Sequence, residues 1–285
     1  QILRDPGVHA IYDATPDGLH ADNIVAAAQA GKHVLVEKPI ALTAAEARRA
    51  IAACEANRVK LGVVYNQRHE EAHREARRLV REGAIGDVML ARASITLRGA
   101  TPNAPPSASW RVDGAFRSGG VLLSIADHAH DIISFILGQQ VVEASALSDA
   151  TRDDPPNERL AALVLRYSGG ALAHVAASGK TPFGNRPFEF LGSKGTLTIA
   201  NSFVYLNGAS PTDPAPRVEL LDANGKQVWR YEPSECFRLE IEQFNRAIAG
   251  AGEPMTSARE GLRAVEIAHA LYAAMREGRV AKIQG

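Results

Sequence analysis

The sequence is poor in cysteine. Only Cys54 and Cys236 occur among 285 residues, and they are too far apart to form a CxxC pair. Two isolated thiols argue against a disulfide framework and against a structural zinc site built on cysteine. We therefore expect both thiols to be reduced, as they are in a cytoplasmic protein.

An excess of either charge is also missing. Lys and Arg together number 32, as do Asp and Glu, which leaves a formal net charge of zero. Without a surplus of basic residues, the surface has no general attraction for nucleic acid or for an anionic membrane. No uninterrupted apolar run reaches the about 18 residues that a membrane-crossing helix needs. We expect neither a nucleic-acid partner nor a membrane partner.

The composition that remains is that of a globular protein. Hydrophobic residues make up 46% of the chain and charged residues 22%, which are ordinary values for a protein with a sizeable core. The length is too great for one average domain and is sufficient for two.

The first third of the sequence alternates between strands and helices. The predicted elements are a strand at 8–14, a helix at 19–30, a strand at 33–36, a helix at 43–57 and a strand at 60–64. Thr43 and Glu46 form a capping box at the start of the second helix. Near-continuous apolar strands separated by helices indicate a parallel sheet that is covered on both faces.

A GxGxxG motif is absent from the chain. Doubly wound dinucleotide-binding domains begin with a strand, this glycine-rich turn and a helix, where backbone N–H groups hold the pyrophosphate. We therefore interpret residues 1–67 as the C-terminal part of an incomplete Rossmann-type domain that lacks its GxGxxG half. The chain also begins with Gln1 rather than Met, as a fragment or a processed product does.

The pattern changes in the remainder of the chain. A charged helix at 70–82 and a long strand at 87–97 are followed by a helix predicted at 124–137. Strands with regular turn signals then run from 141 to 231, and two amphipathic helices close the chain. The fold class is therefore α/β plus α+β. Residues 68–285 are predicted to form a substrate-binding and oligomerisation domain with a large open, mainly antiparallel sheet.

Several short motifs follow one another at characteristic positions. They are Ala14-Thr15-Pro16-Asp17 with His20, Ala30-Gly31-Lys32-His33-Val34, Glu37-Lys38-Pro39, Tyr65-Asn66-Gln67-Arg68, Gly83-Ala84-Ile85-Gly86, Trp110-Arg111, Gly119-Gly120, and a helix with His128 and Asp131. In this order and spacing they resemble the Gfo/Idh/MocA oxidoreductases, which include glucose–fructose oxidoreductase and inositol dehydrogenases. The resemblance covers essentially the whole chain.

The resemblance implies an NAD(P)-dependent oxidoreductase that acts on a sugar, a sugar derivative or a cyclitol. In the family, the EKP lysine lies beside the nicotinamide and the substrate, which assigns Lys38 to polarise the substrate oxygen. A histidine from the second domain serves as acid/base, and His128 matches it. The residues assigned to the cofactor, NAD or NADP, are Thr15, Pro16, His20, Glu37, Lys38, Pro39, Asn66 and Arg68. Those assigned to the substrate are Lys38, Trp110, Arg111, Ser124, Asp127 and His128. Tyr65 is expected with Asn66 and Arg68 at the junction of the domains.

One position departs from the family pattern. Many relatives carry Asp four residues before the histidine, one helical turn away on the same face, whereas this chain has Ser124. A serine hydroxyl donates and accepts hydrogen bonds but cannot act as a carboxylate. Asp127 is adjacent to His128, yet neighbouring helix residues do not face each other.

Two further motifs contain potential metal ligands, but their sequence context favours other interpretations. His69-Glu70-Glu71-Ala72-His73 matches HExxH. It lies in a highly charged stretch, so we expect a solvated helix face rather than a zinc site. In Asp127-His128-Ala129-His130-Asp131, histidines two residues apart on a helix point in directions about 200° apart. No metal site is predicted.

Two alternatives to an active enzyme remain. Ser124 in place of the carboxylate is compatible with a non-catalytic or regulatory homologue that binds a ligand. The missing glycine-rich half is compatible with an inactive fragment of such an enzyme. By family analogy, we expect homodimers or homotetramers formed through the open sheet. The residue that distinguishes NAD from NADP follows the glycine motif by about 20 positions and belongs to the missing segment.

Overall fold

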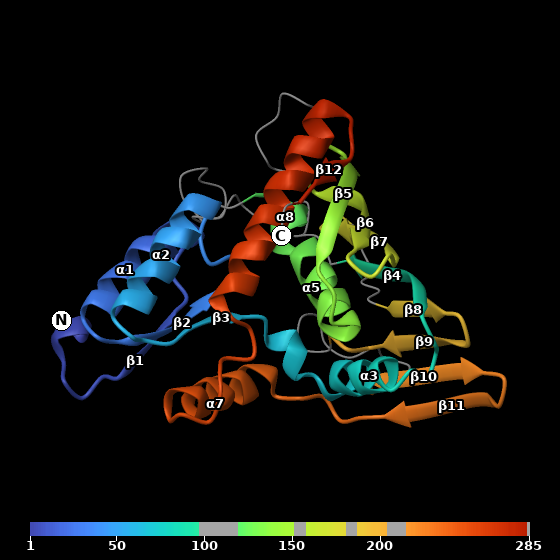
Figure 1. Cartoon of the computed structure of the whole chain (residues 1–285), viewed down its shortest axis with the longest axis horizontal. Helices are drawn as coiled ribbons and strands as arrows, with labels where there is room; N and C mark the ends of the chain where they lie inside the picture. Colours follow the sequence, from blue (N-terminus) through green and yellow to red (C-terminus); the bar gives the residue numbers. More distant parts are fainter. Residues whose placement is uncertain (97–118, 151–157, 181–186, 204–214, 284–285) are drawn as a thin grey trace. The chain divides into compact units, whose positions relative to one another are not determined.

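The computed structural model describes residues 1–96, 119–150, 158–180, 187–203 and 215–283 (Figure 1). Its internal contacts divide the described residues into two compact units. The first contains Gln1–Asn66 and Phe237–Glu266, and the second contains the other described residues. Trp110 and Arg111, two of the predicted substrate residues, lie outside the described ranges.

The first unit is built on a parallel sheet of three strands in the order β1-β2-β3. The elements are β1 (Ala10–Asp13), α1 (His20–Gln29), β2 (His33–Glu37), α2 (Ala44–Ala56) and β3 (Leu61–Val64). Short 3-10 turns occur at Ile2–Arg4, Asp17–Leu19 and Asn66–His69. This alternation confirms the predicted Rossmann-like arrangement. The C-terminal ends of the strands lie at one edge of the sheet, where such folds place their ligands.

Small apolar side chains pack α1 and α2 onto this sheet. The buried cluster includes Ile24, Ala27, Val34, Val36, Ala47, Ala50, Ile51 and Val63. Alanine at the helix positions lets the helices approach the strands closely. At the start of α2, the Thr43 hydroxyl accepts a hydrogen bond from the Glu46 N–H at 3.2 Å, and the Glu46 carboxylate accepts one from the Thr43 N–H at 3.0 Å. The predicted capping box is thereby confirmed.

A segment from late in the sequence completes the first unit. Helix α7 (Cys236–Ile248) contributes Phe244, which packs with Leu35 and Val64, and Glu240, which accepts a hydrogen bond from the Tyr65 N–H at 2.9 Å. The beginning of α8 (Ala258–Glu277) follows. A Cβ atom at Gly261 would lie 2.6 Å from the Val63 side chain, so only glycine allows this approach of helix and strand.

The second unit contains a sheet of nine strands in the order β11-β10-β9-β8-β4-β7-β6-β5-β12. Only β4 and β7 pair in parallel within it; the other neighbours are antiparallel, as the sequence predicts. The strands are β4 (Val88–Thr96), β5 (Val141–Ser148), β6 (Leu160–Tyr167), β7 (Leu172–Ser178), β8 (Phe188–Gly192), β9 (Gly195–Ala200), β10 (Arg217–Asp222), β11 (Gly225–Arg230) and β12 (Ala281–Lys282).

Helices cover one face of this sheet. α3 (Glu71–Arg81) packs on β9 and β10, and α5 (Ala126–Leu137) packs on β4 and β7 (Figure 1). Along β6, alternate residues are buried, which is the period of a strand with one covered face. The residues between them are exposed, and the same face of β5 and β7 is exposed at Leu147 and Leu172.

The helix predicted at 124–137 begins two residues later than predicted, at Ala126. α4 (Val121–Ser124) ends before Ile125, whose φ and ψ angles are −125° and −54°, and α5 begins at Ala126. The Ser124 hydroxyl donates a hydrogen bond to the Gly120 carbonyl at 2.8 Å. Back-bonding of this kind bends helices. The predicted helix is therefore confirmed over Ala126–Leu137, whereas Ser124 belongs to the separate helical turn that precedes it.

The HExxH motif does not form the solvated helix face that the sequence predicts. His69, Glu70 and His73 are all buried. The Glu70 carboxylate accepts hydrogen bonds from the Glu71 N–H at 3.1 Å and from the Ser234 hydroxyl at 3.2 Å, so it caps α3, and burial raises its pKa. The prediction was wrong because these polar groups find their partners far along the chain. In the described ranges, no group of three or more potential ligands could hold a metal ion.

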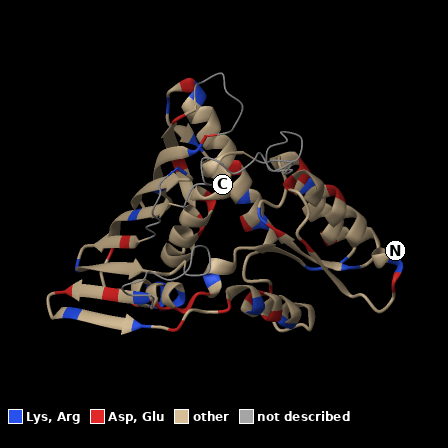
Figure 2. Ribbon diagram, turned by 180° about the vertical axis from the view of Figure 1, so that it is seen from behind, with Lys and Arg blue, Asp and Glu red and all other residues tan. Residues whose placement is uncertain are grey.

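Basic and acidic residues are interspersed over the described residues of both units (Figure 2). α8 illustrates this, since Arg259, Glu260, Arg263 and Glu266 occur within its first turns. Within the part of the chain that the structure describes, no helix is both long and apolar enough to span a membrane.

We predict that His73 makes the stability of the fold dependent on pH. Burial lowers the pKa of its imidazole from 6.5 to about 4. Between these values the unfolded chain binds a proton that the folded chain excludes. The contribution is therefore complete above pH 6.5 and is lost as the pH falls towards 4, by at most about 3 kcal/mol. Urea unfolding followed by circular dichroism across this range measures it.

The variant His73→Gln provides the comparison. It should show a smaller loss of unfolding free energy between pH 6.5 and 4 than the wild type, whereas His269→Gln, at an exposed position of α8, should match the wild type. An identical pH dependence in His73→Gln and the wild type would contradict the prediction.

Candidate active site

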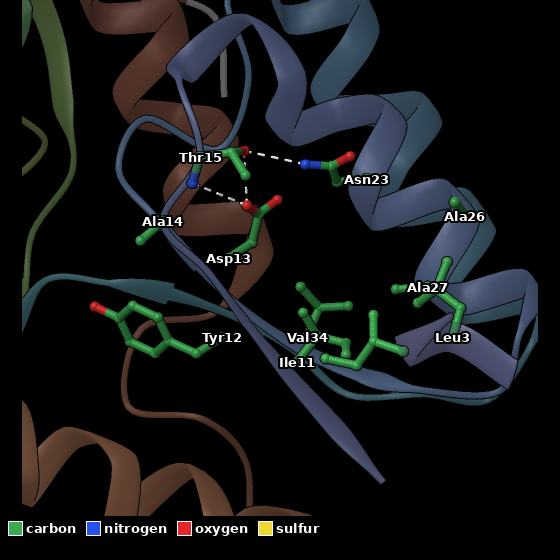
Figure 3. Close-up of a pocket in the computed structure, with 11 residues that line it drawn as sticks. Leu3, Ile11, Tyr12, Asp13, Ala14, Thr15, Asn23, Ala26, Ala27 and Val34 are labelled. Atoms are coloured by element: carbon green, nitrogen blue, oxygen red, sulfur yellow. Dashed lines mark hydrogen bonds between the residues drawn. The ribbon is translucent and has the colours of Figure 1, made fainter. Parts of the chain in front are cut away.

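The turn that follows β1 presents Thr15 at the surface with its hydroxyl oriented by two neighbours. Oγ1 of Thr15 donates to the Asp13 carboxylate at 2.7 Å and accepts from the Asn23 side-chain amide at 3.0 Å (Figure 3). The same Asp13 oxygen accepts from the Thr15 N–H at 3.1 Å. Asp13 is buried, whereas Ala14 and Thr15 are exposed. The turn therefore presents the oriented Thr15 hydroxyl to a ligand, beside the small side chain of Ala14.

His20 lies beneath this turn and is completely buried. Its Nε2 lies 2.9 Å from the Thr15 carbonyl oxygen, and its Nδ1 lies 2.7 Å from the Pro39 carbonyl oxygen. These carbonyls belong to the turns after β1 and β2. The histidine therefore joins the two turns from below and has no exposed surface of its own.

β2 ends at Glu37, and the turn that follows carries Lys38 and Pro39. Glu37 and Lys38 are half-buried, and Pro39 is buried. The Tyr12 hydroxyl donates to the Glu37 carboxylate at 2.7 Å. Burial and the negative charge of Glu37 raise the pKa of the Tyr12 phenol, so it stays protonated and remains a donor. Glu37 is thereby held at the side of the turn, next to Lys38 in the chain.

A cavity of about 300 Å³ lies between β1, α1 and the first residues of the chain. Its wall is mostly apolar, with Asp13, Thr15 and Asn23 at one end (Figure 3). The second carboxylate oxygen of Asp13 is buried and has no hydrogen-bond partner in the part of the chain that the structure describes. The polar end of the cavity is thus formed by Thr15 and the two residues that orient its hydroxyl.

The second unit carries the other predicted catalytic residue. His128 lies in the first turn of α5 and is half-buried, while the neighbouring Asp127 is buried. Asp127 lies 3.3 Å from His130 Nε2, three residues further along the helix. The imidazole of His128 packs against Phe203, with ring centroids 6.2 Å apart. A half-buried imidazole can both contact a ligand and keep a defined orientation.

A buried ion pair anchors α5. The Arg68 side chain donates to both carboxylate oxygens of Asp131, with Nε at 3.1 and 3.0 Å, and its guanidinium lies 5.5 Å from the Phe135 ring centroid. Asn66 is buried as well. The guanidinium of Arg68, which the sequence assigns to the cofactor, is therefore engaged with Asp131 in the second unit. The cofactor roles of Asn66 and Arg68 stay predictions.

The sequence reasoning missed Tyr12, Asp13, Asn23 and Phe203. Tyr12 and Asp13 directly precede the Ala14-Thr15-Pro16 motif, which was a local signal for both. Asn23 follows His20 by less than one helical turn. Phe203 is more than seventy positions from His128, so no local pattern could have connected the two residues.

Comparison with known proteins gives matches over both units. Residues 1–65 match the family model of the oxidoreductase family with an NAD-binding Rossmann fold. Residues 73–198 match the model of the GFO/IDH/MocA C-terminal domain.

Individual relatives match along the whole chain. The sequence is 30% identical to 1,5-anhydro-D-fructose reductase of Ensifer adhaerens, over 100% of this chain and 82% of that protein. It is also 30% identical to inositol 2-dehydrogenase of Rhizobium meliloti (strain 1021), over 95% of this chain and 80% of that protein. The structure matches aldose-aldose oxidoreductase from Caulobacter crescentus, complexed with glycerol, with a TM-score of 0.83 and 27% identity over 99% of this chain and 81% of that one. The chain belongs to the Gfo/Idh/MocA family of oxidoreductases.

Proposed function

We propose that the chain is an NAD(P)-dependent oxidoreductase that transfers hydride between a nicotinamide cofactor and a hydroxyl-bearing carbon of a sugar, sugar derivative or cyclitol. The observation that carries the proposal is the pair of turns at the C-terminal ends of β1 and β2. These turns present Thr15 and Lys38, and the ring nitrogens of His20 lie within hydrogen-bond distance of the Thr15 and Pro39 carbonyl oxygens. The family membership and the names of the relatives, which act on anhydrofructose and inositol, support the same class of substrate.

The residues of the first unit fit a dinucleotide. Thr15 offers an oriented hydroxyl, Ala14 leaves room at its side, and the two turns lie at the strand ends where open α/β sheets bind nucleotides. Thr15, Pro16, Glu37 and Pro39 would hold the nicotinamide half of NAD or NADP, with His20 supporting them from beneath. When bound, the nicotinamide ring exchanges the hydride with the substrate carbon.

Lys38 supplies the positive charge of the proposed mechanism. As an alcohol is oxidised, its oxygen passes through a state with more negative charge. An ammonium group beside that oxygen stabilises the charge. Its half-buried position strengthens this effect because fewer water molecules screen it.

His128 accepts or returns the proton of the substrate hydroxyl in the proposed mechanism. In the oxidation direction, the substrate O–H bond breaks and a ring nitrogen of His128 takes the proton. A bound nicotinamide would accept the C–H hydrogen with its electron pair as hydride, which leaves the carbon–oxygen double bond. In the reduction direction, His128 returns the proton to the oxygen. Asp127, Ser124, Trp110 and Arg111 are retained as proposed substrate residues.

The variant Lys38→Ala should lower turnover by about 100-fold or more, because it removes the charge that stabilises the developing alkoxide. Binding of NADH or NADPH, followed by fluorescence titration, should change little. Lys226→Ala, on the exposed edge strand β11, serves as the control and should keep full turnover. Unchanged turnover in Lys38→Ala would refute its role. Cofactor binding without turnover by the wild type across a panel of polyols would favour a non-catalytic homologue.

The variant His128→Asn should lower kcat by about 100-fold or more, since it removes the general acid/base. It should also abolish the change of kcat with pH that the imidazole causes. His269→Asn, at an exposed position of α8, is the matched control. A pH–rate profile of His128→Asn that superimposes on the wild type would count against the assignment.

We also propose that copies of the chain associate through the open face of the nine-stranded sheet. This face exposes large apolar side chains: Leu147 is 80% exposed, Val164 53%, Leu160 46% and Leu172 37%. These residues lie on adjacent strands β5, β6 and β7 with their side chains on one face. Large apolar side chains exposed together on one face of a sheet are typical of protein–protein contacts.

Replacing Leu147 and Val164 together by Asp should convert dimers or tetramers into monomers, because it places charges in the apolar contact. Size-exclusion chromatography with light scattering gives the mass directly. Ile241→Asp, which alters an exposed apolar residue of α7 in the first unit, should leave the mass unchanged. A doubly substituted protein with the wild-type mass would exclude this face as the interface.

A further inference from the structure

A buried cluster of aromatic and histidine side chains lies against His128 in the second unit. Its members are His73 of α3, Phe188 of β8, and Ser202 and Phe203 of the turn after β9. We infer that Phe203, held in place by the hydrogen bond between Ser202 and His73, is a positioning residue for the His128 imidazole. The inference rests on the proposed acid/base function of His128.

The first step is the link between α3 and the turn after β9. His73 Nδ1 lies 2.8 Å from the Gln67 carbonyl oxygen, and its Nε2 lies 2.8 Å from Ser202 Oγ. A carbonyl only accepts hydrogen bonds, so Nδ1 carries the proton of the neutral ring and Nε2 accepts from the Ser202 hydroxyl. Both His73 and Ser202 are fully buried. The position of Ser202 is thus tied to α3.

The backbone leads directly from this link to Phe203. Asn201 has a φ of 58°, in the left-handed region that asparagine tolerates better than most residues. The chain therefore turns sharply after β9, and the next two side chains enter the interior. Ser202 is bonded to His73, and Phe203, its neighbour in the chain, is 2% exposed.

The Phe203 ring is surrounded by other rings. It stacks on Phe188 at a centroid distance of 5.9 Å and an interplanar angle of 14°, and it meets His73 at 5.8 Å and 62°. His73 also meets Phe188, at 5.5 Å and 76°. Three rings in mutual contact leave little freedom to any one of them, because each fills the space that another would need to rotate.

His128 packs onto this fixed ring. The His128 and Phe203 centroids are 6.2 Å apart with the planes at 78°, an edge-to-face contact. His128 itself is only half-buried, so its orientation depends on what it contacts on its buried side. Phe203 contacts the ring on that side, and it limits the directions in which the imidazole can present a nitrogen to a substrate. An acid/base group needs this precision, since small misplacements cost much of its effect.

This role also accounts for the buried second histidine of the HExxH motif. His73 and His128 lie on different helices, α3 and α5, and both meet the same ring. The hydrogen bond from His73 of α3 holds Ser202, and the neighbouring Phe203 contacts His128. Because Phe203 is apolar, this contact places no charge next to the imidazole.

A double-mutant cycle separates positioning from simple packing. Phe203→Leu should lower kcat by about 10-fold or more while the KM for the cofactor stays the same. In a His128→Asn background, Phe203→Leu should cause no further loss, since the group that it positions is already gone. Phe190→Leu is the matched control: Phe190 is as buried as Phe188 on the same strand and, among the described residues, makes no ring contact. Its effect should be the same in both backgrounds.

A second measurement needs neither turnover nor a known substrate. Two-dimensional nitrogen–proton spectra of the histidine rings identify the His128 signals by their absence in His128→Asn. Ser202→Ala removes only the buried hydroxyl, opens little space and does not alter Phe203 itself. It should shift or broaden the His128 signals, whereas Phe190→Leu should leave them in place. This variant also tests the inference if Phe203→Leu fails to fold.

The outcomes are distinguishable. If His128→Asn keeps full activity, the proposed function of His128 is wrong, and the positioning role is lost with it. If His128→Asn loses activity but the losses from His128→Asn and Phe203→Leu multiply, and Ser202→Ala leaves the His128 signals unchanged, the inference alone is overturned. Strong coupling in the cycle, with no further loss from Phe203→Leu in the His128→Asn background, together with displaced His128 signals in Ser202→Ala supports it.

Discussion

The buried imidazole of His20 is the contact on which the proposed cofactor site depends. It lies between the carbonyl oxygens of Thr15 and Pro39, which belong to the turns after two adjacent parallel strands. Buried carbonyl groups need a donor, and the cost of leaving one without a partner exceeds the gain from forming the bond. A neutral imidazole donates to only one of the two oxygens, and an imidazolium donates to both. In either form, the ring fixes the spacing of the turns that present Thr15 and Lys38.

Burial decides what each histidine of this protein can do. His20 and His73 are fully buried, and both use their ring nitrogens on groups of the protein. His128 is half-buried, so part of its ring is open to a ligand while the rest packs on Phe203. All three lie in motifs of the sequence: His20 in the predicted cofactor site, His73 in the HExxH motif and His128 in the predicted catalytic helix. Only the exposure of each ring separates the structural roles from the proposed catalytic one.

Local sequence signals were sufficient for most of the fold. The alternation of apolar runs and helical patterns located α1, α2 and the strands between them, and the Thr43–Glu46 pair marked the start of α2. These features depend on neighbours within a few residues. The break at Ile125 was not predicted. The Ser124 hydroxyl bonds to the Gly120 carbonyl just before it, and the apolar pattern of the sequence does not reveal this bond.

The misinterpreted residues are those whose partners lie far along the chain. His73 bonds to Ser202, 129 positions away, and Glu70 bonds to Ser234, 164 positions away. A charged, histidine-containing stretch normally indicates a solvated helix, because polar side chains are costly to bury without partners. Those partners come from the turn after β9 and from the segment before α7, and no pattern near residue 70 reveals them. The packing of α7 against β3 was hidden for the same reason.

The substitution at position 124 changes how an acid/base histidine is oriented. A carboxylate at position 124 would act on the imidazole through charge and would also stabilise its protonated form. Here the Ser124 hydroxyl is bonded to the Gly120 carbonyl, and the Asp127 carboxylate lies beside His130. The contact with Phe203 orients the ring by shape, without adding a negative charge. If turnover is retained with this arrangement, a carboxylate at position 124 is not required for the chemistry, and precise packing is a sufficient means of aiming the imidazole.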